Sequence, residues 1–537
     1  MTGLLNKTKR FFTIPKIVFL IELVVVSVAA FSAWPKELIL FLTALLLAYF
    51  LLAPLKESFL VFVASIPLFV AMPLTLNLDY VANWRIFILA MFVSFARQKG
   101  WFSLNYWKNF FQRGGAVKGE LKQKLDFGPG SLKILFLLFF ILMLLSLVVA
   151  QSPSLGLKKI VFLVNIFLLY PMAGLLLGEN KDYPKKLLLA ILAGLVVVLG
   201  VAGAQLALIF FVPLFSFWQL WAQRFIDVFY GSGLALLLTK SNTWFAYYKS
   251  QPPTLRLFSV FPDSHSFAMF LVLCLPAIAG CWALAKKNWQ RRALWGLGFC
   301  SLLAVVLSGS RGAWVGFALA LATAIIGWRK AAAVSRPANK FNLILLSLFL
   351  GAFLLSFAYP PFLYLAQSHQ RGLSGMSLKE SLAFFERARS ISDTDETSNK
   401  GRLEIWDAAI KSVAEKPWLG VGAGNFPFVL GENSGASKKG ASAHNLYLDF
   451  AVEIGVFGAA TLILIFLYFL KMIWVNFASR QEEFAPFLFL ALFVYMIWIL
   501  SYSVFDVVLL NDKVLMLLTV WLAVVDFFYE RRKAARG

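Results

Sequence analysis

The sequence is dominated by long apolar runs that are separated by short polar or basic segments. A helix needs about 20 residues to cross the roughly 30 Å of hydrocarbon in a bilayer, and about fourteen runs approach that length. They lie near residues 15–34, 37–54, 58–76, 80–96, 132–150, 157–177, 186–212, 264–285, 293–309, 312–328, 341–360, 444–470, 484–503 and 507–528. The pattern predicts an all-α polytopic membrane protein with about 12–14 transmembrane helices, because a helix satisfies its own backbone hydrogen bonds in lipid.

The composition agrees with a membrane protein. Of the 537 residues, 60% are hydrophobic and 14% are charged, whereas soluble domains are about half apolar and a quarter charged. The first apolar run follows a basic segment, as a signal peptide would, but it is long and another run follows at once, so we expect a first transmembrane helix. Cys274, Cys281 and Cys300 all lie inside apolar runs, where we expect small buried residues rather than disulfides or metal ligands.

The basic residues predict the orientation of the chain. A net charge of +23 could indicate nucleic-acid binding. However, if the N-terminus is cytoplasmic, the basic clusters all fall on the cytoplasmic side, as the positive-inside rule requires. These clusters are Arg97 to Lys133, Lys181/Lys185/Lys186, Lys286/Lys287/Arg291/Arg292, Arg329/Lys330/Arg336/Lys340 and Arg531/Arg532/Lys533/Arg536. We therefore expect an inner-membrane protein with both termini in the cytoplasm and no nucleic-acid partner.

Three segments outside the apolar runs are long enough to have structure of their own. Residues 101–113 resemble an amphipathic helix on the inner leaflet. Two large loops lie on the outer side, an aromatic-rich one at 213–263 and a polar one at 361–443, between the fourth-last and third-last spans. Within the polar loop, 377–390 and 402–417 have helical periodicity. Loops of this length are usually functional or disordered.

The first candidate site is the turn in "SGSRGAWVGFALA", residues 308–320. It joins two apolar runs on the outer side and contains Arg311. A guanidinium offers a planar fork of donors for phosphate oxygens. The alternative is an arginine that simply extends its charge to the interface from a turn.

The second candidate is "PTLRLFSVFPDSHSFAMF", residues 253–270. Asp263 or Ser264 is a suitable N-cap for the following helix, and this explains the polar residues without a function. His265 is then most simply an interfacial residue. Arg256 has no structural explanation beyond solvation of the loop.

The third candidate is "KGRLEIWDAAIKSVAEKPWLGVGAGNFP", residues 400–427, which contains Arg402 and Asn425. Its glycine spacing suggests a nucleotide loop, but a helix rather than a strand precedes it, so the dinucleotide fingerprint lacks its context. A glycine-rich bend that packs closely against the membrane domain or a glycan is the better interpretation. Asp393 and Asp395 could bind a metal with a diphosphate, although a solvated loop is the simpler interpretation.

The fourth candidate is "AHNLYLDFAVEIGVFG", residues 443–458, at the start of a membrane helix. A neutral His444 imidazole can accept a proton, whereas Asn445 could cap the helix and make His444 merely its neighbour. Asp449 and Glu453 are four residues apart, on one helix face. A carboxylate inside a membrane helix generally pairs with a cation, so we expect Arg311 or Arg402 as the partner of Glu453.

Taken together, these stretches resemble the O-antigen ligase/polymerase superfamily of membrane glycosyltransferases. "SGSRGAWVGFALA", "GRLEIWDAAIKSVAEKPWLGVGAGNF" and "AHNLYLDFAVEIGVFG" match three blocks of that family in order and spacing. The resemblance covers about residues 256–470. It divides the chain into N-terminal helices with an outer aromatic-rich loop (1–255), a ligase-like core that includes the loop 361–443 (256–470), and C-terminal helices (471–537).

The resemblance implies a metal-independent, inverting transfer of a glycan from undecaprenyl diphosphate to an acceptor hydroxyl on the periplasmic face, without a cofactor. It implies that His444 is the base or orients the acceptor, and that Arg311, Arg402 and Arg256 hold the diphosphate. Glu453, Asn445 and Asn425 would support them. The chain departs from the family's usual Pro-Asn at Pro262-Asp263, which leaves the role of that block open.

Several functions fit this resemblance. The leading one is ligation of O-antigen to lipid A-core. A polymerase of O-antigen or exopolysaccharide with the same fold, and a protein O-oligosaccharyltransferase, are alternatives that the motifs do not separate. A polysaccharide transporter is a different class of function. It predicts two related halves and basic residues along a central cavity, whereas the polar residues here gather at the outer ends of the helices.

Overall fold

The computed structural model describes residues 13–32, 34–75, 81–101, 103, 132–239, 245–248, 251–356, 397–430, 442–478 and 482–535. The segments expected to form helices at 101–113 and 377–390 lie almost wholly outside these residues, as do Asp393 and Asp395. Within the described part, the chain is a bundle of apolar helices.

The N-terminal half supplies helices that precede the ligase-like core. Their bounds are α2 (Ile14–Phe31), α3 (Pro35–Leu52), α4 (Leu55–Ser65), η1 (Ile66–Leu68), α5 (Trp84–Gln98), α8 (Leu132–Ser146), η2 (Leu147–Val149), α9 (Pro153–Phe167), α10 (Leu169–Glu179) and α11 (Tyr183–Phe211). The outer segment after α11 contains α12 (Leu214–Leu220), a π-helical turn η3 (Trp221–Ile226), α13 (Asp227–Tyr230), α14 (Ser232–Thr239), β1 (Phe245–Tyr248) and β2 (Gln251–Leu255).

The C-terminal half contains all four candidate stretches. Its bounds are α15 (Ser264–Leu284), α16 (Asn288–Leu307), α17 (Arg311–Ile326), α18 (Trp328–Val334), α19 (Arg336–Ser356), α22 (Thr397–Glu415), η5 (Phe426–Leu430), α23 (Leu446–Phe477), α24 (Ala485–Tyr502), η7 (Val508–Leu510) and α25 (Asp512–Ala534). The one sheet in the described residues is the antiparallel hairpin of β1 and β2.

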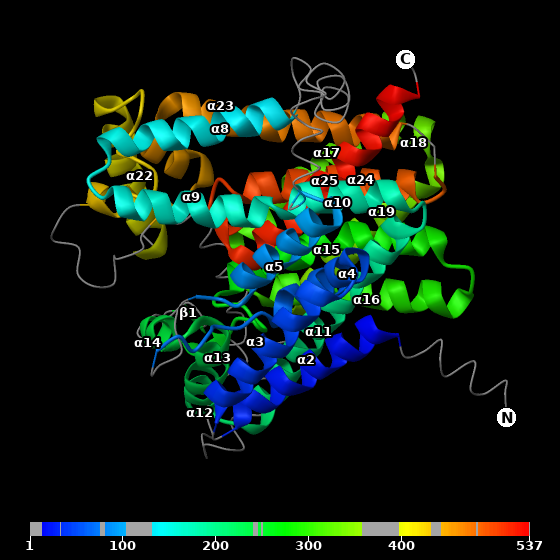
Figure 1. Cartoon of the computed structure of the whole chain (residues 1–537), viewed down its shortest axis with the longest axis horizontal. Helices are drawn as coiled ribbons and strands as arrows, with labels where there is room; N and C mark the ends of the chain where they lie inside the picture. The colour runs from blue at the N-terminus through cyan, green and yellow to red at the C-terminus, as the bar shows by residue number, and fades with distance from the viewer. Residues whose placement is uncertain are drawn as a thin grey trace.

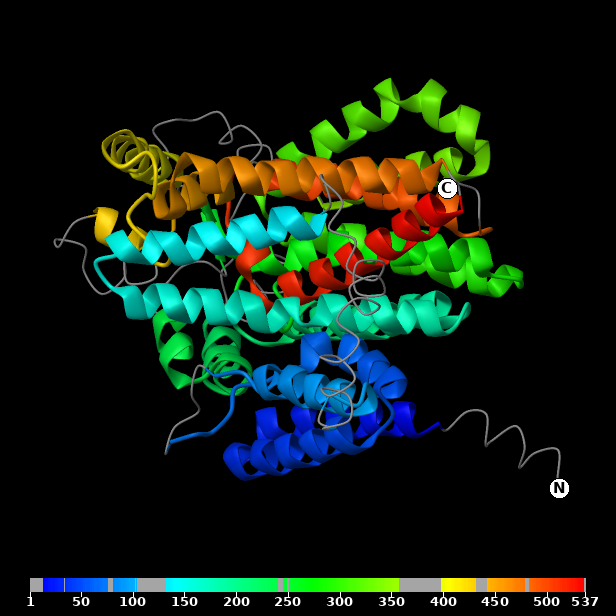
Figure 2. The same cartoon turned by 45° about the horizontal axis from the view of Figure 1, so that its top comes forward.

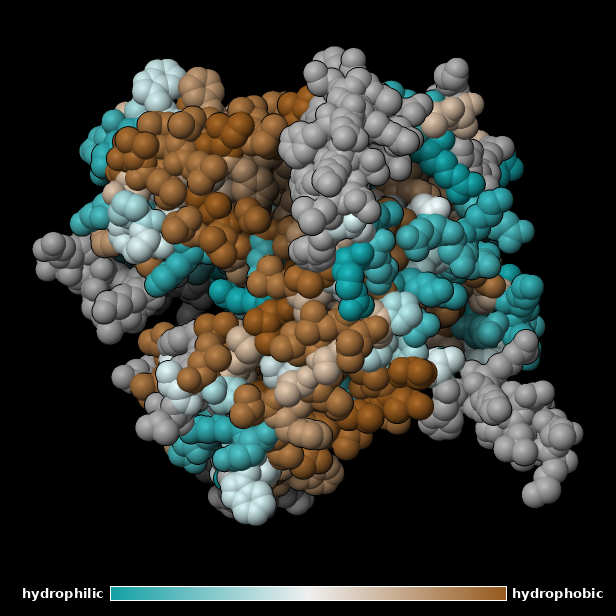
Figure 3. All heavy atoms as spheres, viewed as in Figure 1, coloured by the Kyte–Doolittle hydropathy of each residue, from teal (hydrophilic) through white to brown (hydrophobic). Residues whose placement is uncertain are grey.

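The long helices run roughly along one direction (Figures 1 and 2). Helices α8, α9 and α23 lie along one side, and α22 sits at one end of the bundle. The C-terminus lies at the opposite end. Figure 3 shows a broad hydrophobic surface over α8 and α23, with hydrophilic side chains near both ends. This distribution is the one that a bilayer around the middle of the bundle requires.

The chain is a multi-pass membrane protein. Within the described ranges, nine helices are long and apolar enough to span a membrane, or ten if α17 and α18, which are bent by 63°, count as one span. Each predicted run overlaps a helix. The four remaining runs correspond to the short α4 and α5, to α16, which has two arginines near its start, and to α25, which carries charged residues along its length.

The core lies where α15 and α17 pack against α24. Two glycines of α17 allow the close approach, because a Cβ on Gly312 would lie 2.8 Å from the Tyr502 ring and one on Gly316 would lie 2.8 Å from Trp498. The Trp498 indole donates to the Ala313 carbonyl at 2.7 Å. Small residues one turn apart are a common basis of helix packing in membranes. The stretch that contains Arg311 is therefore also a packing motif.

The long helix α23 is broken at Ile454 and Gly455, where the backbone leaves helical geometry. The glycine-rich loop after α22 fills the break: the amides of Val421 and Gly422 donate to the carbonyls of Val452 and Glu453 at 2.8 and 2.9 Å. A kink frees backbone groups that need new partners in a membrane. The interpretation of this loop as a bend packed on the membrane domain is confirmed.

The segment 213–263, which was expected to be long enough to have structure of its own, contains short helices and the hairpin. One expectation needs correction at this level. Cys274 and Cys281 are buried as expected, but Cys300 is exposed. Helix α16 carries Cys300 at the surface of the bundle, where an apolar run can face lipid instead of the core.

Candidate functional site

His444 lies in a turn just before α23, with a positive φ of 47°. That conformation is unfavourable for a residue with a Cβ, so the surrounding contacts must hold it. Asp449 accepts from the Ala443 amide at 3.0 Å, and the Trp406 indole donates to the Ala443 carbonyl at 2.8 Å. The Leu446 amide donates to the Ser503 carbonyl at the end of α24 at 2.8 Å. The imidazole is thereby fixed between α22, α23 and α24.

Asp506 lies close to His444, in the segment that joins α24 to η7. Its Oδ1 atom is 3.9 Å from His444 Nδ1 and also accepts from the Val507 amide at 2.8 Å. The His444 side chain is 44% exposed, yet its Nδ1 atom is buried. The ring is therefore open to solvent on one side, while its buried Nδ1 atom lies on the side of the Asp506 carboxylate.

The surroundings of Asp506 favour its ionised form. Burial acts to raise the pKa of its carboxyl, but the contact with His444 and the charge of the Arg402 guanidinium hold that pKa below its usual range. A carboxylate next to Nδ1 favours the tautomer with a proton on Nδ1 and a lone pair on Nε2. The arrangement is that of a base oriented by a third group.

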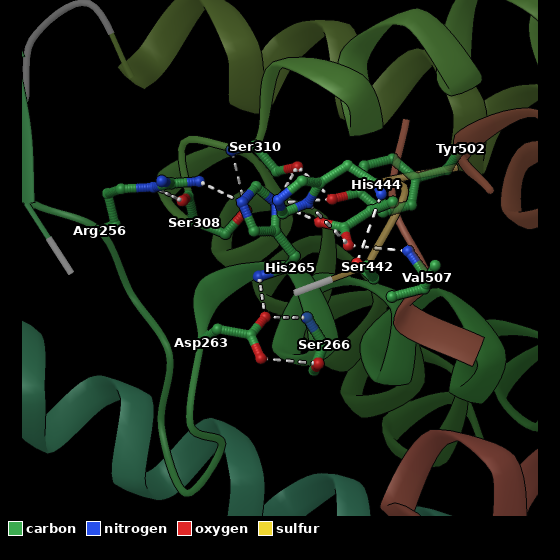
Figure 4. A network of polar contacts seen from close by, with 11 residues as sticks. Arg256, Asp263, His265, Ser266, Ser308, Ser310, Ser442, His444, Tyr502 and Val507 are labelled. Carbon is green, nitrogen blue, oxygen red and sulfur yellow. Dashed lines mark hydrogen bonds and ion pairs between the residues drawn. The ribbon is translucent and has the colours of Figure 1, made fainter. Parts of the chain in front are cut away.

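His265 approaches the same carboxylate from the first turn of α15, with Nδ1 3.9 Å from Asp506 Oδ2. Asp263 caps that helix by accepting from the amides of His265 and Ser266 at 2.9 and 2.7 Å. The predicted N-cap is therefore confirmed. His265, however, is not a simple interfacial residue, because it contacts Arg256, Ser310 and Tyr502 inside the bundle (Figure 4).

Arg256 reaches into the site from the end of the hairpin. Its Nε donates to the Ser308 carbonyl at 3.0 Å, and its Nη2 is 3.3 Å from His265 Nε2. The segment that follows Arg256 is held by Gln205, whose side-chain oxygen accepts a hydrogen bond from the Ser259 amide at 2.8 Å. Ser259 itself has a positive φ of 52°. Buried contacts thus hold a strained turn that positions Arg256.

The other two predicted arginines border the network. Arg402 lies on α22 one turn before Trp406, and its charge contributes to the low pKa of Asp506. Arg311 is the first residue of α17 and directly follows Ser310, whose hydroxyl contacts His265 and Tyr502. The structure therefore places His444, His265 and Arg402 around the Asp506 carboxylate, while Arg256 joins this group through His265 and Arg311 follows Ser310 in the chain.

The expected partner of Glu453 was wrong. Its carboxylate contacts Lys159 of α9 at 2.5 Å, rather than either arginine, and Lys159 also lies 3.4 Å from Asp449. Sequence reasoning considered only cations near the motif, whereas the fold brings α9 against this end of α23 from the N-terminal half. The ammonium group balances two carboxylates that are almost completely buried.

The remaining predicted residues have structural contacts. Asn445 caps α23 by accepting from the amides of Tyr447 and Leu448 at 3.0 and 3.1 Å. Asn425 accepts from the Ser152 amide at 2.7 Å and donates to the Ser152 carbonyl at 3.2 Å, which attaches the glycine-rich loop to the start of α9. Within the described residues, neither side chain contacts the network around Asp506.

Sequence reasoning missed Asp506, Ser310 and Tyr502. Each lies near the outer end of an apolar run, where polar residues are expected in any case, so only Asp506, a lone acid in "YSVFDVVLL", gave a usable signal. In the described part of the chain, no three His, Cys, Asp or Glu side chains are grouped so as to hold a metal ion. What the site offers is a partly exposed His444 imidazole in a network that also contains the Arg256 and Arg402 guanidinium groups.

Comparison with known proteins identifies a part of the chain that contains some of this site. Residues 296–463 match the family model for O-antigen ligase. This part of the chain is similar to O-antigen ligases. It includes Arg311, Arg402 and His444 and falls inside the predicted core of 256–470, while Arg256, His265 and Asp506 lie outside the matched residues. The recognition of the O-antigen ligase-like superfamily is confirmed.

Two curated relatives share part of this ligase-like chain. The "General O-oligosaccharyltransferase" of Acinetobacter baylyi is 26% identical over 236 residues, which are 42% of this chain and 37% of the relative. The "ComP-specific O-oligosaccharyltransferase" of the same organism is 26% identical over 220 residues, which are 40% of this chain and 35% of the relative. The chain thus matches little more than a third of the length of either relative.

Proposed function

We propose that this chain is an inverting, metal-independent glycosyltransferase that moves a glycan from undecaprenyl diphosphate to an acceptor hydroxyl on the periplasmic face of the inner membrane. The observation that carries the proposal is the partly exposed imidazole of His444, whose buried Nδ1 atom lies 3.9 Å from the Asp506 carboxylate, with the charge of Arg402 close enough to lower the pKa of that carboxyl. The O-antigen ligase domain at 296–463 supports the same activity.

The chemistry that this geometry supports is a single displacement. His444 Nε2 accepts the proton of the acceptor hydroxyl while the oxygen attacks the anomeric carbon opposite the diphosphate. The bond between that carbon and the phosphate oxygen breaks, and the diphosphate leaves with the electron pair. Guanidinium groups compensate the growing negative charge, and electrostatic stabilisation of this kind is usually the largest catalytic contribution. Asp506 orients the imidazole and stabilises its protonated form.

The arrangement of charge along the bundle supports the proposed orientation. The site and α22 lie at one end, opposite the end where the C-terminus lies (Figure 1). Lys181 and Arg531 line one pocket, so two of the basic clusters predicted to be cytoplasmic meet in the fold. The lipid donor cannot leave the membrane, and a site at the bilayer surface is where its diphosphate would be presented.

We assign ligation of O-antigen to lipid A-core as the leading specific function, because the matched domain is described as O-antigen ligase. Transfer to a protein hydroxyl is a second candidate, since both curated relatives are named O-oligosaccharyltransferases. In either case the donor is a lipid-linked glycan and the acceptor supplies an oxygen nucleophile.

The test is reconstitution of the full chain in lipid with undecaprenyl diphosphate-linked glycan and, in separate reactions, lipid A-core, a protein acceptor and further lipid-linked glycan. The product distinguishes ligase, protein transferase and polymerase.

The same assay tests the proposed base. His444→Ala should lower turnover by about 10²- to 10⁴-fold, the usual contribution of a general base. Arg311→Lys should also be severely impaired if its bidentate contact matters. Unchanged turnover in His444→Ala would contradict the assignment of the base.

A further inference from the structure

His265 is partly buried in the site, with its side chain 20% exposed, and the displacement described above gives it no role. Its ring lies between two different sets of partners (Figure 4). Nε2 is 3.3 Å from Arg256 Nη2. Nδ1 is 2.6 Å from the Tyr502 hydroxyl and 2.9 Å from the Ser310 hydroxyl. Both ring nitrogens are therefore engaged at hydrogen-bond distance.

The chemistry of the partners decides the tautomer of His265. A guanidinium can only donate hydrogen bonds and does not lose its proton in proteins. Nε2 must therefore accept from Arg256, so the ring is neutral and its proton is on Nδ1. The Tyr502 and Ser310 hydroxyls can both accept from that N–H, and the Asp506 carboxylate lies 3.9 Å away on the same side. A protonated ring would place two donors against each other and a positive charge beside Arg256.

Two anchors then determine the direction of the Arg256 guanidinium. The Ser308 carbonyl, at the end of α16, accepts from Nε, and His265, in the first turn of α15, accepts from Nη2. Two bonds to a planar group fix its plane. Because α15 is almost completely buried in the bundle, the His265 anchor is rigid.

We propose that His265 is a positioning residue for the lipid donor: as the neutral Nδ1–H tautomer, it accepts a hydrogen bond from Arg256 and holds that guanidinium in the orientation that binds the diphosphate. This inference rests on the proposed function. His265 itself touches neither substrate nor the reacting atoms, and its effect is on recognition of the donor rather than on proton transfer.

A matched pair of substitutions distinguishes the contact at Nε2 of His265 from the contacts at Nδ1. The amide oxygen of Gln in His265→Gln reaches the position of Nε2 and can still accept from Arg256. The side chain of Asn in His265→Asn reaches only the position of Nδ1, so it keeps the contacts with Ser310 and Tyr502 but loses Arg256. A merely structural role for the buried ring predicts similar losses from both variants.

The experiment measures kcat and KM for the lipid-linked donor with the full chain in nanodiscs, together with binding of glycan-free undecaprenyl diphosphate. His265→Asn should raise the donor KM and the dissociation constant for the lipid diphosphate by about tenfold or more, the value of a hydrogen bond to a charged group, with a smaller change in kcat. His265→Gln should stay close to wild type. Equal effects of the two variants on KM, or an effect of His265→Asn on kcat alone, would overturn the proposal.

A double-mutant cycle with Arg256→Gln tests the coupling directly. If His265 acts through Arg256, adding His265→Asn to Arg256→Gln should change lipid diphosphate binding very little. Additive losses would overturn the proposal.

If His265→Asn does not fold, Tyr502→Phe takes its place, because it removes an acceptor for the Nδ1–H and should raise the same donor KM. An unchanged KM in that variant would likewise refute the inference.

The binding measurement keeps this inference distinct from the proposed function. A wild-type chain that transfers no glycan but binds undecaprenyl diphosphate, more weakly after His265→Asn, would refute the transferase activity and support the positioning role. Active transfer with no effect of His265→Asn on donor KM would support the transferase activity and refute the positioning role. A wild-type chain that neither transfers glycan nor binds the lipid diphosphate would refute both.

Discussion

At the scale of single residues, the site combines groups that are individually unfavourable. His444 has a left-handed backbone conformation, and Asp506 keeps a buried negative charge. A strained backbone conformation such as that of His444 costs on the order of 1–3 kcal/mol and persists only where the surrounding contacts enforce it. Here the enforcement comes from Trp406, Asp449 and Ser503, which belong to three different helical segments. The imidazole is thus oriented before any substrate binds.

The low pKa of Asp506 gives a prediction about acid stability. Since its pKa is lower in the folded chain than the unfolded value of about 3.9, the ionised carboxylate stabilises the fold at higher pH. That contribution is present above about pH 4 and is lost as the pH falls through the folded pKa. Asp506→Asn should therefore lower the melting temperature in detergent at pH 7, and the difference from wild type should shrink at pH 3. A difference that grows on acidification would contradict the assignment.

At the scale of elements, two contacts join the N-terminal helices to the matched region at the end of the bundle that contains the site. The glycine-rich loop is attached to α9 through Asn425, and Lys159 of α9 binds the carboxylates of α23. A buried cation between two acids is costly to remove, because the acids remain without compensation. The start of α23, and with it His444, therefore depends on a helix that lies outside the matched domain.

Replacing Lys159 tests this dependence. Lys159→Met should destabilise the chain by about 3–5 kcal/mol, the cost of breaking a buried ion pair from one side. Thermal unfolding in detergent measures the effect. Adding Glu453→Gln should recover part of the loss. The matched control is Lys185→Met, whose pair with Asp182 is exposed and should contribute about 0–1 kcal/mol. Equal effects of the two lysine substitutions would contradict the role of the buried pair.

Helix α17 offers a second test, in the contact that places Ser310 and Arg311. Gly316→Ala puts a Cβ 2.8 Å from Trp498, so α17 must move away from α24, and overpacking of this kind costs about 1–3 kcal/mol. Gly351→Ala in α19 is the control, because a Cβ there meets nothing within 4 Å. It should be neutral or slightly stabilising, since alanine favours a helix by about 0.5–1 kcal/mol. Equal changes in melting temperature for Gly316→Ala and Gly351→Ala would argue against close packing of α17 on α24.

At the scale of the whole molecule, the polar site is at one end of the bundle and basic clusters are near the other. This separation predicts that two exposed positions are labelled from opposite sides of the membrane. Ile410 on α22 is 60% exposed and Trp289 at the start of α16 is 64% exposed. In a Cys300→Ser background, Ile410→Cys should react with a membrane-impermeant maleimide in spheroplasts. Trp289→Cys should react only after permeabilisation. The reverse pattern would invert the proposed orientation.

The sequence by itself determined the class of the protein, the positions of its apolar helices, the helix at α22 and the caps at Asp263 and Asn445. These features depend on the length of apolar runs, on helical periodicity and on the residues next to a helix start, all of which are local. The ordered motifs also indicated the ligase-like domain and the turn that contains His444. None of these conclusions required contacts between distant segments.

Only the tertiary structure decided which charges meet. The partner of Glu453 is Lys159, some 290 residues earlier in the chain, and the carboxylate behind His444 is Asp506, from the segment after α24. His265 changed from an interfacial residue to the anchor of Arg256 for the same reason. In a membrane protein a buried charge is stabilised by the partner that helix packing brings near it, and packing depends on the shapes of whole helices rather than on distance along the chain.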